Sequence, residues 1–151
     1  MFVARTRRQQ TGDAIADMVE RLATGTSVVL FAEGTSSDGN RVLPFRSALI
    51  GAVREAGVRS ASGILIQPMS ICYTRLHGIP MGRQHRPVVA WYGDLDFVPH
   101  FKAFIARGAV DVMITYGDPV SADGSADRKA MTKVLHGAVR DITASTLRGR
   151  P

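Results

Sequence analysis

The chain has 151 residues, of which 45% are hydrophobic and 21% charged, and this is enough for one compact domain. No apolar stretch is long enough to span a membrane, and no signal peptide is visible after Met1. The one cysteine, Cys72, excludes a disulfide within the chain and fits a reducing cytoplasm. The formal net charge of +6 suits nucleic acid, an anionic membrane surface or a phosphorylated small molecule, although an Arg-rich composition can equally reflect a GC-rich genome.

The first third of the chain alternates between expected strands and helices. Residues 2–4 look like the end of a strand, and the apolar spacing over 13–23 predicts a helix. The run at 27–32 predicts a buried strand. A second helix is expected to begin at Pro44, where proline suits the first turn, and to end at Gly57.

The remaining elements continue this alternation. The pattern predicts a strand over 64–73 with an edge or bulge at Pro68, a polar stretch over 74–87, a strand over 88–92, a helix over 99–107, a strand over 110–116 and a helix over 127–147. The inward side chains expected in the last two helices are Phe101, Phe104 and Ile105, then Met131, Val134, Leu135, Ala138 and Ile142. We therefore expect one α/β domain over residues 1–151, with a mostly parallel or mixed central sheet flanked by helices.

The segment after the strand at 27–32 carries the clearest sign of function. The strand ends at a carboxylate, Glu33, and continues into a loop of Gly34, Thr35, Ser36 and Ser37. Such a loop can direct N–H groups and hydroxyls at an anion, with Arg41 and Arg46 nearby in the sequence. An ordinary strand-to-helix turn, an acid that caps local N–H groups and solvated arginines would explain the same residues.

Other chemistries have little support in the sequence. The histidines at positions 77, 85 and 100 have no partner at metal-ligand spacing, so no metal site is expected. A Walker loop, a Gly-x-Ser-x-Gly elbow and the basic-aromatic interleaving of nucleic-acid binders are all missing from the 151 residues. We therefore expect no nucleic-acid partner.

Four blocks in this chain have counterparts in one enzyme family. They are Phe2-Val3-Ala4-Arg5, Phe31-Ala32-Glu33-Gly34-Thr35-Ser36 with Pro44-Phe45-Arg46-Ser47-Ala48, Ile66-Gln67-Pro68-Met69-Ser70-Ile71, and Tyr116-Gly117-Asp118-Pro119-Val120. In this order they resemble the Phe-Ile-x-Arg, Phe-Pro-Glu-Gly-Thr-Arg, Val-x-Pro-Val and Phe-Gly-Glu-Pro-Ile blocks of the glycerolipid acyltransferases. Lysophosphatidic acid acyltransferase is the best-known member of that family.

The resemblance implies an acyltransferase of glycerophospholipid synthesis, similar to 1-acylglycerol-3-phosphate O-acyltransferase. Acyl-CoA or acyl carrier protein would be the co-substrate, with no other cofactor, and a lysophospholipid would be the acceptor. It further implies that Glu33, Gly34 and Thr35 shape the acceptor site, that Arg5 helps to hold a phosphate, and that the block around Pro68 contributes a wall. A peripheral position on the cytoplasmic face of the membrane is implied as well.

The departures from the family pattern concern phosphate binding and the catalytic base. Ser36 stands where many members have arginine, which leaves phosphate binding more dependent on Arg5, Arg41 or Arg46. The family's His-x-x-x-x-Asp block, which supplies the general base, belongs upstream of the arginine block. This spacing occurs once, at His136 and Asp141, in an expected helix that turns the two residues to different faces, so we expect solvated side chains there.

Two functional interpretations follow from these departures. In the first, the chain is an acyltransferase domain without its N-terminal catalytic segment, and it has little or no activity alone. In the second, it is a non-catalytic module that binds anionic lipid or phosphate.

Overall fold

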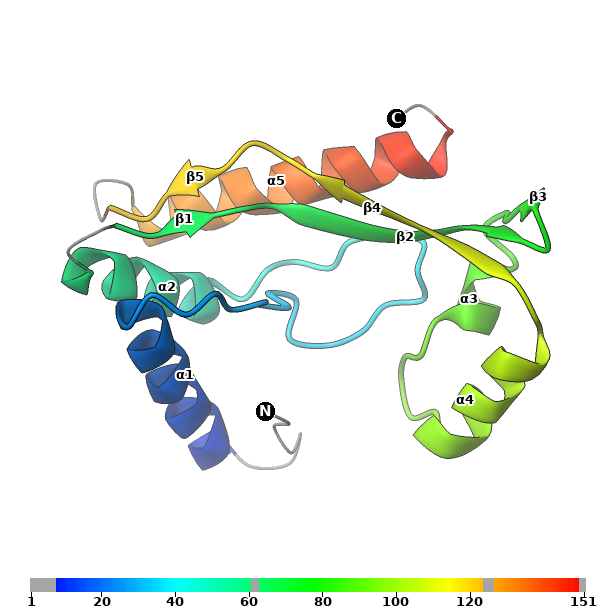
Figure 1. Cartoon of the computed structure of the whole chain (residues 1–151), viewed down its shortest axis with the longest axis horizontal. Helices are drawn as coiled ribbons and strands as arrows, with labels where there is room; N and C mark the ends of the chain where they lie inside the picture. The colour runs from blue at the N-terminus through cyan, green and yellow to red at the C-terminus, as the bar shows by residue number, and fades with distance from the viewer. Residues whose placement is uncertain (1–7, 61–62, 124–126, 150–151) are drawn as a thin grey trace. The chain divides into compact units, whose positions relative to one another are not determined.

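The computed structural model describes residues 8–60, 63–123 and 127–149. The helices are α1 (Arg8–Ala23), α2 (Ser47–Arg59), α3 (Arg86–Val89), α4 (Phe97–Ala106) and α5 (Arg128–Leu147). The strands are β1 (Leu65–Ile66), β2 (Met69–Leu76), β3 (Ile79–Pro80), β4 (Val110–Tyr116) and β5 (Val120–Ser121). The expected α/β class, with helices beside β-sheet, is confirmed (Figure 1).

The chain divides into two compact units. The first consists of the residues up to Ala32 together with Arg46–Ile66 and Pro119–Lys133, and the second consists of Glu33–Phe45, Gln67–Asp118 and the residues from Val134 onward. The strand expected at residues 2–4 lies outside the described residues.

The first unit is built on the pair of helices α1 and α2. Apolar side chains recur along each helix at the spacing of one face, so the two helices bury these faces against each other. The buried cluster contains Met18, Val19, Ala52, Val53, Ala56 and Ala122. A short antiparallel pair of β1 and β5 belongs to the same unit, with Leu65 opposite Ser121.

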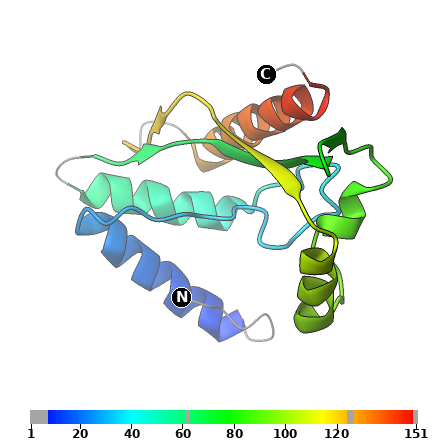
Figure 2. The same cartoon turned by 45° about the vertical axis from the view of Figure 1, so that its right-hand side comes forward.

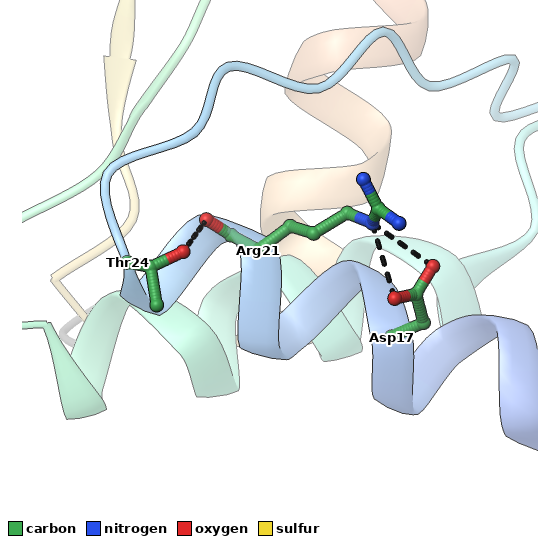
Figure 3. A network of polar contacts seen from close by, with 3 residues as sticks. All are labelled: Asp17, Arg21 and Thr24. Atoms are coloured by element: carbon green, nitrogen blue, oxygen red, sulfur yellow. Dashed lines mark hydrogen bonds and ion pairs between the residues drawn. The ribbon is translucent and has the colours of Figure 1, made fainter.

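The exposed side of α1 near its end is held by local polar contacts (Figure 3). Arg21 Nε donates to Asp17 Oδ2 at 3.0 Å, one helical turn earlier, and Thr24 Oγ1 donates to the Arg21 carbonyl at 2.9 Å. An exposed ion pair at this spacing contributes about 0.3–0.5 kcal/mol. These contacts therefore support the helix end without determining the fold.

Gly57 does not end the second helix as expected, because α2 continues to Arg59. A Cβ built on Gly57 would lie 1.8 Å from the carbonyl oxygen of Ala122, a backbone atom that has no rotamer through which to withdraw. Glycine at this position allows the close approach of the helix to the residue after β5.

The buried strand expected at 27–32 is not formed. The segment alternates in burial as an extended chain does: Val28 and Leu30 pack on the core of the first unit, whereas Val29 and Phe31 are 69% and 72% exposed. An extended segment becomes a strand only when a neighbouring strand pairs with it, and the structure shows none for these residues. The continuous apolar sequence at 27–32 predicted a segment buried on both faces, whereas the structure buries only the face that carries Val28 and Leu30.

The second unit contains a three-stranded antiparallel sheet in the order β3-β2-β4 (Figure 2). Side chains of β2 alternate between faces, and Ser70 and Cys72 point to the buried one. On that face Ser70 Oγ and Thr143 Oγ1 of α5 are 2.7 Å apart, so α5 covers it. The break expected at Pro68 is confirmed, since this residue separates β1 from β2.

A tight hairpin that the sequence analysis missed joins β2 to β3. Leu76 pairs with Ile79, which leaves His77 and Gly78 as a two-residue loop with φ of 54° and 76°. Positive φ at both loop residues is typical of a type I′ turn, whose twist matches that of the strands. The usual sign of such a turn is Asn-Gly or Asp-Gly, and His-Gly did not suggest it.

Two expectations for the middle of the chain are wrong. Residues 88–92 do not form a strand, because α3 occupies Arg86–Val89 with Pro87 in its first turn, where proline favours a helix start. The α4 helix was expected to turn Phe101, Phe104 and Ile105 inward, yet none of its residues is buried and Ile105 is 62% exposed.

The last helix follows the prediction closely. The Asp127 carboxylate accepts hydrogen bonds from the N–H groups of Lys129 and Ala130 at 2.9 and 3.2 Å, so it caps α5. Met131 and Leu135 are buried as expected, whereas Val134 is exposed. In the part of the chain that the structure describes, no helix is both long and apolar enough to cross a membrane.

The sheet itself differs from the expected one in strand direction. A mostly parallel or mixed sheet was expected, whereas every strand pair among the described residues is antiparallel. The chain connects β2 to β3 through a tight turn, and α3 and α4 lie between β3 and β4. An antiparallel partner can be reached in either way, because antiparallel pairing does not require a crossover helix.

Candidate functional site

Residues 33–45 form an irregular loop that closes on itself within the second unit. The Glu33 carboxylate accepts a hydrogen bond from the backbone N–H of Leu43 at 2.8 Å, ten residues further along. Gly34 has a φ of 67°, in the left-handed region that favours glycine, and so turns the chain directly after the carboxylate. Thr35 is exposed and Ser36 half-buried at the start of the loop.

The Glu33 side chain is in an environment that resists ionisation. Its partial burial raises the pKa of the carboxyl above the usual 4.5, while the Leu43 N–H and the charge of His136 each lower it. The burial is the largest of these influences. A carboxylate held at a loop in this way can accept a hydrogen bond from a hydroxyl or an ammonium group of a ligand.

The tip of the loop is fixed by a compact turn. Ser37 Oγ donates to the Arg41 carbonyl at 2.9 Å and accepts from the Gly39 N–H at 3.3 Å. The Asp38 carboxylate accepts from the backbone N–H and the side-chain amide of Asn40, both at 3.1 Å. This is an Asx-type turn, which the Asp-Gly-Asn sequence favours.

Asn40 also joins the loop to the neighbouring α3 segment. Its amide nitrogen donates to the Arg83 carbonyl at 3.1 Å, and its carbonyl oxygen accepts from Arg86 Nη1 at 3.1 Å. Arg86 is only 8% exposed, and its Nη2 donates to the Met81 carbonyl at 3.1 Å. A buried guanidinium needs such partners, so Asn40 and Arg86 stabilise each other and the loop.

Basic side chains surround the outer part of the loop. The pKa of Asp38 is lowered mainly by its hydrogen bonds with Asn40, and the charges of Arg41 and Arg83 lower it further. Arg41 and Arg83 are both exposed. Glu33 therefore supplies a carboxylate at the base of the loop, whereas Asp38, Arg41 and the neighbouring Arg83 supply charges of both signs at its tip, a combination suited to a polar ligand with both signs of charge.

The other residues selected from the sequence are in separate places. Arg5 lies outside the described residues. Arg46 belongs to the first unit, where it is the exposed N-cap of α2 and its N–H donates to the Ala32 carbonyl at 2.8 Å, so the helix begins three residues after Pro44. Pro68 is buried beside the sheet, where its carbonyl accepts from the Gly117 N–H at 2.9 Å.

The His136 and Asp141 side chains differ from the expected solvated pair. Asp141 is exposed and accepts a hydrogen bond from its neighbour Arg140 at 2.9 Å. His136 is half-buried, and its ring lies 5.3 Å from the Phe45 ring in an edge-to-face arrangement at 77°. The expectation of a solvated His136 was therefore wrong, because α5 turns this residue toward the end of the 33–45 loop.

Sequence reasoning missed three contributors to this site. Asn40 could have been found from the Asp-Gly-Asn turn, since asparagine at such positions forms hydrogen bonds within the turn. Arg86 and His136 had no such signal. Their roles depend on contacts between segments more than 40 residues apart, as in the Arg86–Asn40 bond.

Comparison with known proteins gives several matches. A family model described as Acyltransferase matches residues 1–72. The lyso-ornithine lipid O-acyltransferase of Brucella abortus is 46% identical over 154 residues, covering 99% of this chain and 57% of that protein. The enzyme of the same name from Rhizobium meliloti is 42% identical over 151 residues, covering 99% of this chain and 52% of that protein.

A more distant relative extends the same pattern. The lyso-ornithine lipid O-acyltransferase of Rhodobacter capsulatus is 29% identical over 143 residues, covering 93% of this chain and 48% of that protein. No solved structure is a significant match. The chain spans about half the length of the curated relatives that it matches. The family model and these relatives agree with the resemblance to acyltransferases that the four ordered blocks carry, and the chain is similar to acyltransferases over almost its whole length.

Proposed function

We propose that this chain takes part in the O-acylation of a lysolipid and that the 33–45 loop binds the polar head of the acceptor. The observation that carries the proposal is the 46% identity to the Brucella abortus enzyme, which extends over 99% of the chain and therefore includes the loop. The fixed Glu33 carboxylate and the cations at Arg41 and Arg83 supply groups that a polar lipid head requires.

The acceptor that fits best is a lyso-ornithine lipid, the acceptor in the names of the relatives. Free ornithine carries amino and carboxyl groups, so a head derived from it can offer a hydrogen-bond donor to Glu33 and an acceptor to Arg41 or Arg83. Lysophosphatidic acid, suggested by the family resemblance, offers a phosphate without an ammonium group. Without an ammonium group lysophosphatidic acid offers Glu33 no charged donor, and the names of the relatives do not include it, so we rank the phosphate acceptor lower.

The acyl donor in this proposal is a thioester, either acyl-CoA or acyl carrier protein. The acceptor hydroxyl attacks the thioester carbonyl, an ester bond forms, the carbon–sulfur bond breaks, and the hydroxyl proton leaves with the help of a base as the thiol departs. Asp141 is paired with Arg140, and His136 packs against Phe45, so we do not assign the base to this pair. We propose that these 151 residues bind the acceptor and catalyse little transfer alone.

A peripheral position on the cytoplasmic face of the membrane is part of the same proposal. The acceptor is a lipid, and the formal net charge of +6 favours an anionic surface. Vesicles with and without anionic lipid would test this position, with stronger retention of the chain expected on the anionic vesicles.

The proposed activity is tested by two measurements on matched proteins. The first is binding of a short-chain lyso-ornithine lipid to the 151-residue chain by titration calorimetry, with lysophosphatidic acid as the comparison. The second is acyl transfer by the same chain and by a chimera in which it replaces the matching segment of the Brucella abortus relative. We expect binding by the chain and turnover by the chimera. A chimera that folds and binds neither lipid would contradict the proposal, and turnover by the chain alone would contradict the proposal that these residues catalyse little transfer alone.

A further inference from the structure

His136 carries one of the buried side-chain nitrogens near the 33–45 loop that have no hydrogen-bond partner among the described residues, and Arg86 Nε is another. In His136 this atom is Nε2. The His136 ring contacts Phe45 edge to face, with centroids 5.3 Å apart. The residue lies on α5, more than 90 residues from the loop in sequence, and both belong to the second compact unit.

The contact with Phe45 connects His136 to the closure of the loop. Phe45 comes two residues after Leu43, whose N–H holds the Glu33 carboxylate at 2.8 Å. The charge of His136 also acts on Glu33, where it favours the ionised carboxylate against the effect of burial. His136 therefore acts on the two ends of the loop, through its ring at one and through its charge at the other.

Packing alone does not explain a histidine at this position. A phenylalanine could make the same edge-to-face contact with Phe45 without burying a polar nitrogen, which costs free energy when it lacks a partner. Histidine, unlike phenylalanine, also lowers the pKa of the Glu33 carboxyl through its charge. Such an arrangement is typical of a residue that orients another side chain for a ligand.

We propose that His136 is a positioning residue that packs on Phe45 and holds the Glu33 carboxylate in place for the polar head of the lysolipid. This inference rests on the proposed function for its ligand, and on the structure for the contact itself. It gives the last helix a part in acceptor binding that the four sequence blocks did not indicate.

The other charged groups of the loop are engaged at its opposite end. Asp38 interacts with Asn40, Arg41 and Arg83, and Arg86 is held by Asn40 and the Met81 carbonyl. The influences on the Glu33 carboxyl are its burial, the Leu43 N–H and His136. A change at His136 should therefore be detected at Glu33 and leave Asp38 unaffected.

The test compares three variants of the 151-residue chain: His136→Phe, His136→Gln and the control His100→Phe on α4. The pKa of the Glu33 carboxyl is measured by carbon-13 NMR titration, and binding of the short-chain lyso-ornithine lipid by calorimetry. We expect His136→Phe to raise the pKa of Glu33 and to weaken binding about tenfold. His136→Gln, which removes both the ring and the charge, should weaken binding at least as much, and His100→Phe should match the wild type.

The outcomes distinguish this inference from the proposed function. If the wild-type chain does not bind the lipid and His136→Phe still raises the pKa of Glu33, the acceptor proposal fails and the electrostatic influence of His136 on Glu33 stands. Unchanged pKa and unchanged binding in folded His136→Phe would overturn the inference. If that variant does not fold, His136→Gln decides, because loss of the charge should still raise the pKa of Glu33. In a Glu33→Gln background, His136→Phe should have no further effect on binding.

Discussion

The carboxylate of Glu33 accepts a hydrogen bond at 2.8 Å from the backbone N–H of Leu43, ten residues further along, and so closes the loop between them. The bond lies within one compact unit, and its acceptor is the acidic residue of the Glu-Gly-Thr block. The structure thus gives this acid a definite position before any ligand binds. Two predictions concern the stability of this loop, a third concerns two glycines of α2, and a fourth tests acceptor binding itself.

The stability of the chain should depend on pH through Glu33. Burial raises the pKa of this carboxyl above 4.5 in the folded state, so the folded chain holds the proton more tightly than the unfolded chain does. The stabilisation from this proton is full below the pKa of the unfolded carboxyl and is lost as the pH rises through the higher folded pKa.

Urea unfolding of the wild type and Glu33→Gln between about pH 4 and about pH 7.5 measures this effect. Relative to the variant, the wild type should lose free energy of unfolding as the pH rises. A wild type that gains stability relative to Glu33→Gln over this range would show that burial does not control the carboxyl.

Replacement of Asn40 by alanine should loosen the tip of the loop. The substitution removes the partner of buried Arg86 Nη1 and the bonds to Asp38 and the Arg83 carbonyl. Because a buried charged donor loses its acceptor, we expect a loss of about 1–3 kcal/mol in the free energy of unfolding. Gln84→Ala, at an exposed residue of the same region, serves as the control and should change it by less than about 0.5 kcal/mol. Equal effects of the two substitutions would argue against the Asn40 contacts.

Replacement of two glycines of α2 by alanine should change the stability of the chain to very different extents. At Gly57 a Cβ would meet the Ala122 carbonyl oxygen at 1.8 Å, so Gly57→Ala should destabilise the chain by about 3 kcal/mol or more. At Gly51 a Cβ would meet Arg128 Cδ at 2.6 Å, an atom near the end of a flexible side chain that can move away. Gly51→Ala should therefore be near neutral, because the gain of about 1 kcal/mol in helix propensity offsets the cost of moving the Arg128 side chain. Thermal unfolding distinguishes the two, and a harmless Gly57→Ala would mean that the backbone approach is absent.

Local sequence patterns predicted the positions of the four longer helices, although they missed the short α3. The apolar spacing of α5 reflects a face that is buried through Met131 and Leu135, and Asp127 caps it as its side chain allows. Strand β4 was found with its observed bounds because it is a run of β-branched residues. In both cases the information is contained within one segment.

The failures arise where a segment depends on a distant partner. The apolar run at 27–32 has the composition of a strand, but strand formation requires a neighbour that pairs with it. Gly57 looked like a helix end, although its role is set by Ala122, which is 65 residues away in sequence. His136 looked solvated on a helical face, and its contact with Phe45 could not be read from either residue.

The features of the candidate site were likewise predictable from the sequence only where they lie within one segment. The Glu-Gly-Thr loop was found from its sequence, because a carboxylate followed by glycine and hydroxyl residues is a local pattern. The contacts that hold the loop, from Asn40 to Arg86 and from Phe45 to His136, join segments that only the fold brings together.

The central claim, that Glu33 binds the polar head of a lysolipid, is tested most directly by the affinity of the chain for a short-chain lyso-ornithine lipid before and after Glu33→Gln. Glutamine keeps an oxygen for the Leu43 N–H and removes the charge, so the loop should stay closed while binding weakens about 10- to 100-fold. Glu55→Gln, at an exposed residue of α2, is the matched control and should bind as the wild type does. Equal affinities of the wild type, Glu33→Gln and Glu55→Gln would contradict the account.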